Sequence, residues 1–272
     1  MTASIRPAVA YLLLAVVGAG SFLYPFWLPA GSMPTQAHAG DAPLVAALVG
    51  FLAVTALVLE VRHGTMNGLT IALLGVLGAS AGLLRLIDLP GGGSGIFFLI
   101  VLAGAAFGPR FGLLLGLTAM STSAVVTGGI GPWLPFQMLG LAWMGAGAGL
   151  VGRATCHAPG ATEVAVLCAY GWVWGFLYGA ILNLWFWPFA LGEGPLSWVP
   201  GAPVAENLRR YWSFYVLTSA GWDAAGALTN AVLIAFTGAA LLTTMRRFAP
   251  RLTPSVQFGQ VEVSTPAPGV KL

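Results

Sequence analysis

Long apolar runs, separated by short breaks rich in glycine, proline or charge, recur along most of the chain. A helix of about 20 apolar residues is long enough to cross the roughly 30 Å hydrocarbon core of a membrane. Eight such runs are recognisable: Pro7–Leu28, Leu44–Glu60, Met66–Ile87, Gly95–Phe107, Phe111–Val126, Phe136–Val151, Glu163–Trp187 and Phe214–Met245. The pattern predicts an all-α integral membrane protein with about eight transmembrane helices.

The fourth run, Gly95–Phe107, is shorter than the roughly 17 to 25 residues of a usual membrane span. It is either re-entrant or shielded by neighbouring helices, and seven spans is therefore the alternative to eight. The longest connection is expected over Gly192–Tyr211. The polar segment 251–272 is expected to form a solvated cytoplasmic tail.

Composition supports this fold class. Charged residues make up 7% of the chain, whereas soluble domains contain roughly 25%. The 38 glycines fall largely within apolar runs, and glycine is common in membrane helices. A formal charge of +3, spread along the chain, is too small for a nucleic-acid footprint. The expected surroundings are therefore membrane lipid, without nucleic acid.

The basic residues predict the orientation in the membrane. If the N-terminus is cytoplasmic and the chain crosses eight times, Arg85, Arg209 and Arg210 lie outside. The remaining eight basic residues lie inside: Arg6, Arg62, Arg110, Arg153, Arg246, Arg247, Arg251 and Lys271. This bias follows the positive-inside rule. It predicts a multi-pass protein of the cell (inner or plasma) membrane with both termini in the cytoplasm.

A signal peptide ending at Ala37–Ala39 is the alternative reading of the N-terminus. The apolar part of a signal peptide has about 7 to 15 residues and lies close to the cleavage site. Here the run is longer and ends well before that site, so a retained helix is favoured.

Catalytic and metal-binding chemistry is not apparent in the sequence. The histidines His38, His63 and His157 fall in expected loops on different sides, and Cys156 and Cys168 form no CxxC motif. A zinc site needs about four such ligands. No GxxxxGK[ST] phosphate loop occurs, so the chain is not expected to use ATP itself. We predict that it is not an enzyme and has no catalytic residues, metal or cofactor.

Asp223 is the acidic residue expected deepest in a span, about nine residues into the last run, roughly 14 Å from its end. A carboxylate there costs about 2.5 kcal/mol or more unless it is paired or hydrated. It either has a functional role or bonds a neighbouring helix, for example through Thr229 or Asn230. Asn183 shares a helix face with Trp187, and it either binds a ligand or forms an interhelical hydrogen bond worth about 0.6 kcal/mol.

Aromatic residues gather on the expected outer side. They are Trp133, Phe136, Trp185, Trp187, Trp198, Tyr211, Trp212, Tyr215 and Trp222. They form either an interfacial belt or a vestibule for a planar ligand. Trp133 and Gln137 are four residues apart and share one helix face. Arg85 and Asp88 lie near the outer end of the third run, where they either pair or face a ligand.

Small residues recur at a spacing of four. The pairs and triplets are Gly75/Ala79, Gly78/Gly82, Gly108/Gly112/Gly116, Gly145/Gly149 and Gly171/Gly175/Gly179. Such stripes let helices approach closely. They serve packing within the chain or contact with another membrane subunit.

From about Met66 onward the chain resembles the substrate-binding S components of energy-coupling factor (ECF) vitamin transporters, in particular the actinobacterial members. The resemblance is carried by the following segments: IFFLI at 96–100, GAAFGPRFG at 104–112, STS at 121–123 and GGIGPWLPFQM at 128–138. It covers roughly the last three-quarters of the chain.

The resemblance implies a six-helix substrate-binding core at 63–250, preceded by two additional helices at 1–62. It implies that the chain captures a vitamin or related micronutrient outside and delivers it with a T subunit and two ATPases, which use the ATP. Cobalamin or a precursor is one candidate substrate, and thiamine is another. A stand-alone permease and a membrane assembly factor are the competing classes.

On this reading, two groups of residues are candidates for function. The outer pocket is expected at Arg85, Trp133, Gln137, Asn183, Trp187, Trp222 and Asp223. The contact with the T subunit is expected at Gly75, Gly78, Ala79 and Gly82, which match the small-residue motif of the family approximately.

Overall fold

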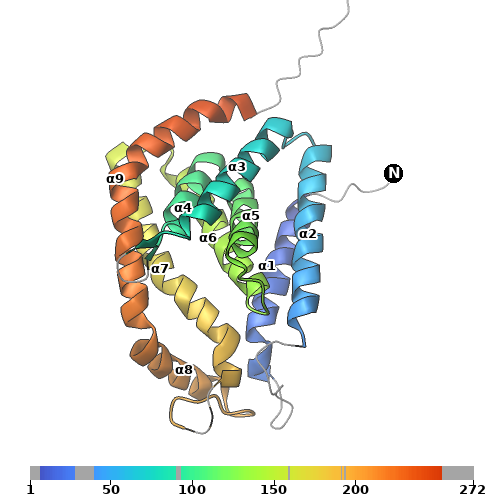
Figure 1. Ribbon diagram of the computed structural model, residues 1–272, viewed down its shortest axis with the longest axis vertical. Coiled ribbons are helices and arrows are strands. Elements are labelled where there is room, and N and C mark those ends of the chain that lie inside the picture. Colours follow the sequence, from blue (N-terminus) through green and yellow to red (C-terminus); the bar gives the residue numbers. More distant parts are fainter. Residues whose placement is uncertain are drawn as a thin grey trace, which may run out of the picture.

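A computed structural model describes residues 7–27, 40–89, 93–158, 160–190, 192 and 194–252, and these form a helical bundle (Figure 1). Its helices are α1 (Pro7–Leu23), the 3-10 helix η1 (Tyr24–Trp27), α2 (Ala42–Arg62), α3 (Gly68–Leu84), α4 (Ile96–Phe107), α5 (Pro109–Thr127), α6 (Leu134–Thr155), α7 (Gly160–Ala190), α8 (Val204–Thr218) and α9 (Ala220–Leu252). Two short antiparallel strands, β1 (Asp88–Leu89) and β2 (Gly93–Ser94), join α3 to α4.

Within the described residues, six helical segments are long and apolar enough to cross a membrane: α1 with η1, α2, α5, α6, α7 and α9. Helices α3 and α4 are apolar but have 17 and 12 residues. The all-α membrane fold is therefore supported, whereas a count of eight spans is not established. Helix α4 is shielded by α5, α6 and α9, and its Ile100, Val101, Leu102 and Ala103 are fully buried.

The eighth predicted run, Phe214–Met245, is divided in the structure. The chain bends at Ser219, where α8 ends and α9 begins. Helix α8 lies across one end of the bundle (Figure 1) and buries Tyr211 and Tyr215 while exposing Trp212. The prediction of one continuous helix was wrong because the break is one residue long, contains no proline and lies between apolar stretches.

The same bend changes the position of Asp223. This residue lies in the first turn of α9 rather than nine residues inside a helix. The loop predicted over Gly192–Tyr211 is also partly helical, because α8 already begins at Val204.

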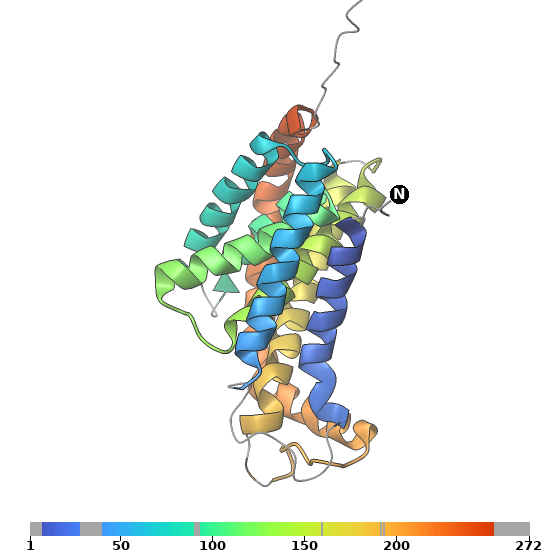
Figure 2. The ribbon, with the colours of Figure 1, turned by 90° about the vertical axis from the view of Figure 1, so that its right-hand side faces the viewer.

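The bundle has two distinct ends. We call them the α8 end, where α8 lies, and the terminal end, where α2 and α9 finish. Arg209 and Arg210 belong to α8. At the terminal end Arg110 and Arg153 line one cavity together with Glu60 and residues near the end of α9. Figure 2 shows α1 and α2 side by side along one flank, where they contact α6.

The helices α4, α5 and α6 come into backbone contact at glycine residues. A Cβ atom added at Gly112 of α5 would lie 2.1 Å from the carbonyl oxygen of Gly145 in α6, and the reverse addition gives the same distance. A Cβ at Gly104 of α4 would lie 2.5 Å from that same Gly145 oxygen. Because real Cβ contacts below 3.0 Å are essentially never found, these backbones touch only where the side chain is missing.

Helices α7 and α9 also pack closely at glycine positions. A Cβ at Gly175 would lie 2.5 Å from Cα of Ala227, and one at Gly179 would meet the carboxylate of Asp223. At Gly171 it would meet the side chain of Ile234. The stripe Gly171/Gly175/Gly179 therefore serves packing within the chain, the first of the two uses expected for it.

We expect Gly112→Ala to lower the thermal unfolding midpoint of the detergent-purified protein by about 2–10 °C, since overpacking a tight contact typically costs about 1–3 kcal/mol. Gly50→Ala in α2 is the matched control, because a Cβ there meets no described atom within 4 Å. Equal midpoints for the two variants would contradict the glycine crossing.

Candidate ligand-binding site

A cavity of about 260 Å³ lies among α3, α4, α5, α6, α7 and α9. We call it the central cavity. Its lining residues are Arg85, Ser94, Ile96, Phe97, Met120, Gln137, Gly175, Tyr178, Trp222, Asp223 and Gly226. Four of the seven residues predicted for the pocket are therefore found together here.

Asp223 enters the central cavity from the first turn of α9. Its Oδ2 accepts a hydrogen bond of 2.9 Å from the hydroxyl of Tyr215 in α8, and that hydroxyl also lies 3.1 Å from the carbonyl oxygen of Phe176 in α7. Asn230, one of the partners expected for Asp223, instead donates to the carbonyl oxygen of Gly171 at 2.9 Å. The position of the carboxylate thus depends on α8.

Arg85 enters the same cavity from the residue that follows α3. Its Nη1 lies 3.2 Å from Sδ of Met120 and 3.5 Å from Oγ of Ser123, both in α5. The side chain of Asp88, the acidic partner expected for it, lies outside the described part of the structure. The cavity therefore receives a cation from α3 and a carboxylate from α9.

Gln137, in the first turn of α6, has a buried side-chain oxygen, Oε1, that accepts no hydrogen bond within the described residues. The rings of Phe97 and Tyr178 lie with centroids 4.9 Å apart and form an aromatic part of the wall. Trp222 is 71% exposed and lies at the rim.

A second cavity of about 300 Å³ adjoins the central cavity at Gln137, and we call it the side cavity. It is lined by Trp133, Gln137, Leu182, Asn183, Trp185 and Phe186. The Nδ2 group of Asn183 donates to Oγ of Ser219, between α8 and α9, at 2.8 Å, so Asn183 forms a hydrogen bond to another segment, close to one of its two expected uses. Trp133 and Gln137 share this cavity, as their spacing indicated, and Asn183 lines it as well.

Trp187 does not belong to either cavity. It is fully buried, its Nε1 donates to the carbonyl oxygen of Leu196 at 2.8 Å, and it packs edge-on against Trp198 and Tyr211. The assignment of Trp187 to the pocket was wrong, because α8 and the preceding loop fold over this ring. Part of the aromatic group is therefore a packed cluster rather than a vestibule.

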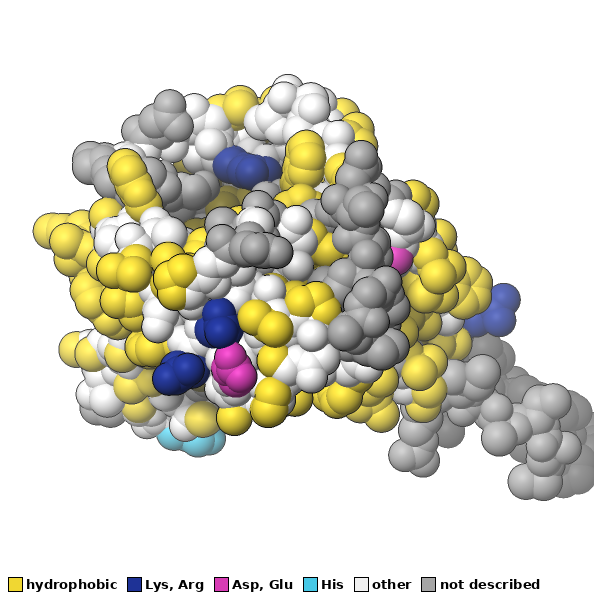
Figure 3. Space-filling model, turned by 90° about the horizontal axis from the view of Figure 1, so that it is seen from below, with side chains coloured by type: hydrophobic (Ala, Val, Ile, Leu, Met, Phe, Trp, Pro, Cys, Tyr) yellow, Lys and Arg dark blue, Asp and Glu magenta, His cyan; other side chains and the backbone are white. Residues whose placement is uncertain are grey.

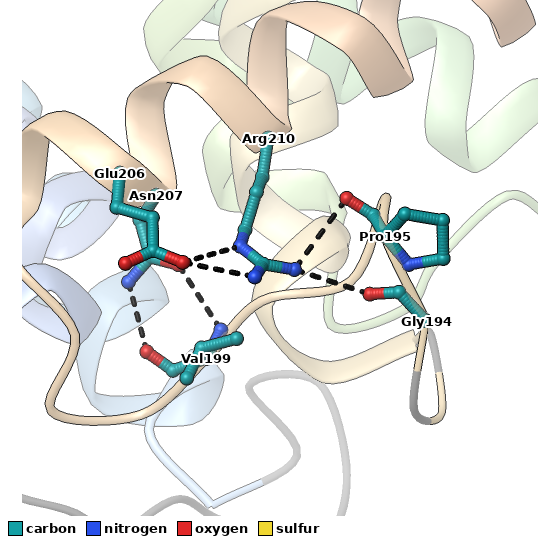
Figure 4. A network of polar contacts seen from close by, with 6 residues as sticks. All are labelled: Gly194, Pro195, Val199, Glu206, Asn207 and Arg210. Atoms are coloured by element: carbon teal, nitrogen blue, oxygen red, sulfur yellow. Dashed lines mark hydrogen bonds and ion pairs between the residues drawn. The ribbon is translucent and has the colours of Figure 1, made fainter.

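A clasp of polar contacts holds α8 to the preceding loop (Figure 4). Asn207, which is 1% exposed, accepts from the backbone N–H of Val199 at 3.0 Å and donates to its carbonyl oxygen at 2.9 Å. Arg210 binds Glu206 at 2.9 Å and the carbonyl oxygen of Gly194 at 3.2 Å. These contacts position α8 and, through its tyrosine, the carboxylate of the central cavity.

The small residues predicted for the T-subunit contact divide between two faces of α3. Gly78 and Gly82 pack against α5, and a Cβ at Gly82 would lie 3.0 Å from the carbonyl oxygen of Ala119. Gly75 has no described atom within 4 Å of its Cβ position, and Ala79 is partly exposed. Only Gly75 and Ala79 therefore leave space for another helix.

Seven of the eleven residues that line the central cavity were not predicted for the pocket, and the two aromatic ones are Phe97 and Tyr178. Tyr178 is three residues from Gly175, so the spacing of the glycine stripe already placed it close to the α9 face of α7. Phe97 lies within a uniformly apolar run and carries no such signal.

No cluster of three or more metal-ligating side chains occurs among the described residues. Comparisons with known protein families, with characterised proteins and with solved structures found no match to this chain.

Asn207→Ala should increase cleavage of segment 194–203 by proteinase K about tenfold, because losing a buried hydrogen-bonding group costs about 1–3 kcal/mol and favours local opening. Arg209→Ala, an exposed position on the same helix, is the control and should be cleaved at the original rate. Identical cleavage of both variants would show that the clasp does not hold the loop.

Proposed function

We propose that this chain is the substrate-binding S component of an ECF-type ABC importer. It captures a vitamin or related micronutrient in the central cavity on the outer face and delivers it inward with a T subunit and two ATPases. The observation that carries the proposal is the central cavity itself, which is lined by Arg85, Gln137 and Asp223. Its lining residues all fall within 85–226, inside the core expected from the resemblance.

The distribution of charge supports an outward-facing cavity. Arg110 and Arg153 line the cavity at the terminal end, and the last turn of α2 with Arg62 and the pair of Arg246 with Glu163 lie at the same end. This end therefore has more arginines than the α8 end, and the positive-inside rule assigns it to the cytoplasm. The α8 end then faces outward, and both termini are cytoplasmic. Seen from that end, hydrophobic side chains are mixed with other surface, and Lys, Arg, Asp and Glu side chains appear at a few places (Figure 3).

The interior favours capture over a continuous permeation path. The terminal end contains a separate cavity lined by Phe107, Arg110 and Arg153, among others. Along α4, α5 and α6, the crossing glycines lie between the residues of this cavity and those of the central cavity. Backbone contact at Gly112 and Gly145 leaves no room for a solute there, so a stand-alone permease would have to separate these helices.

The proposal assigns no chemistry to the chain itself. ATP is used by the partner ATPases, and the chain contributes the solute site and a surface for the T subunit. On α3 the open positions Gly75 and Ala79 are the best candidates for that surface, since small residues let a partner helix approach closely.

The proposal is tested by co-expressing the tagged chain with the T subunit and two ATPases encoded in the same genome and measuring their co-purification in mild detergent. We expect a complex of all four, and we expect Gly75→Trp to reduce recovery of the T subunit at least tenfold by blocking the open face of α3. Gly50→Trp in α2, also an open position, is the control. If the original chain captures neither the T subunit nor the ATPases, the proposed function is wrong.

A further inference from the structure

The central cavity contains groups of opposite charge on different elements, and this pairing restricts the ligand. An isolated charge inside a membrane protein is costly, and such charges usually face a partner or a water-filled cavity. Arg85 contacts two neutral acceptors in α5. A guanidinium has five N–H donors, so Arg85 retains donors for a ligand.

The carboxylate on the other side of the cavity also retains binding capacity. An ionised carboxylate has about four lone-pair sites, and the hydroxyl of Tyr215 uses one of them. The carboxylate of Asp223 lies against the backbone of α7 at Gly179, where an added Cβ atom would meet it, and this contact fixes its position. Asp223 is therefore a positioned acceptor for a protonated amine or another N–H group.

The side chain of Gln137 also lines the cavity. Its Oε1 is buried and has no partner among the described residues, and the amide group as a whole can both donate and accept hydrogen bonds. The cavity thus presents a cationic donor, a carboxylate and a neutral amide to the same molecule.

Size and wall chemistry restrict the ligand further. A volume of about 260 Å³ is below the roughly 300–1,000 Å³ of pockets that take drug-sized ligands. A corrinoid macrocycle exceeds that class and is disfavoured. The neighbouring rings of Phe97 and Tyr178 form an apolar wall suited to a planar body.

We propose that the central cavity binds a small planar zwitterionic solute, whose anionic group contacts Arg85 and whose amine or N–H group contacts Asp223. This inference rests on the proposed function and names the substrate class of the same site. A purely cationic solute such as thiamine leaves Arg85 facing a like charge. A purely anionic solute leaves Asp223 facing a like charge.

The first experiment measures the thermal stability of the detergent-purified full-length chain with a panel of probes. The zwitterion L-tryptophan, the anion indole-3-propionate and the cation tryptamine share one ring and differ in charge. Thiamine, nicotinate, cobalamin and 4-aminophenylalanine complete the panel. We expect saturable stabilisation by a zwitterionic member, and no comparable shift with its single-charge analogues.

The second experiment measures the Kd of the stabilising probe in variants. Arg85→Gln and Asp223→Asn should each raise Kd about tenfold or more, because each removes a charge-assisted hydrogen bond. Arg85→Lys and Asp223→Glu retain the charges and should recover part of the binding, which separates loss of contact from misfolding. Arg209→Gln, an exposed change on α8, should leave Kd unchanged.

The outcomes distinguish this inference from the proposed function. Stabilisation by cobalamin or thiamine, or a Kd unaffected by both charge-removing variants, overturns the zwitterion assignment and leaves solute capture in place. If no probe stabilises a chain that still co-purifies with the T subunit, the assignment is likewise overturned. If the chain neither binds a solute nor associates with the T subunit, the proposed function is wrong as well.

Discussion

The approach of α4, α5 and α6 at Gly104, Gly112 and Gly145 is the contact on which the rest of the molecule depends. Lipid tails are as apolar as leucine, so helices in a membrane gain little from hydrophobic burial and associate largely through close packing and polar contacts. Glycine permits that packing by removing the side chain between two backbones. The short helix α4 can therefore lie enclosed among longer neighbours, and its N-terminal end contributes to the central cavity.

This crossing also separates the central cavity from the cavity at the terminal end. The central cavity lies toward α8, the cavity lined by Phe107, Arg110 and Arg153 lies toward the terminal end, and the touching backbones lie between them along α4, α5 and α6. The polar groups of the central cavity are held by different devices: Arg85 by α5, and Asp223 by Tyr215 and the glycine stripe of α7. Because Tyr215 of α8 donates to Asp223, and α8 is held by its clasp to the preceding loop, the position of the carboxylate depends on how α8 packs on the bundle.

Much of the fold followed from the sequence, because length and apolar character identify membrane helices well. The bend at Ser219 did not, since the break between α8 and α9 is one residue long and contains no proline. The spacing of Trp133 and Gln137 predicted that they share a helix face, and both line the side cavity. Trp187 was misplaced because its burial depends on α8 folding back, a long-range contact that periodicity does not contain.

Solute access to the central cavity from outside the cell is the central claim, and cysteine labelling measures it directly. With Cys156 and Cys168 replaced by serine, Gln137→Cys should react in intact cells with a charged, membrane-impermeant methanethiosulfonate reagent. Arg153→Cys, at the opposite end, should react only after permeabilisation. Labelling of Gln137→Cys only in permeabilised cells would contradict an outward-facing cavity.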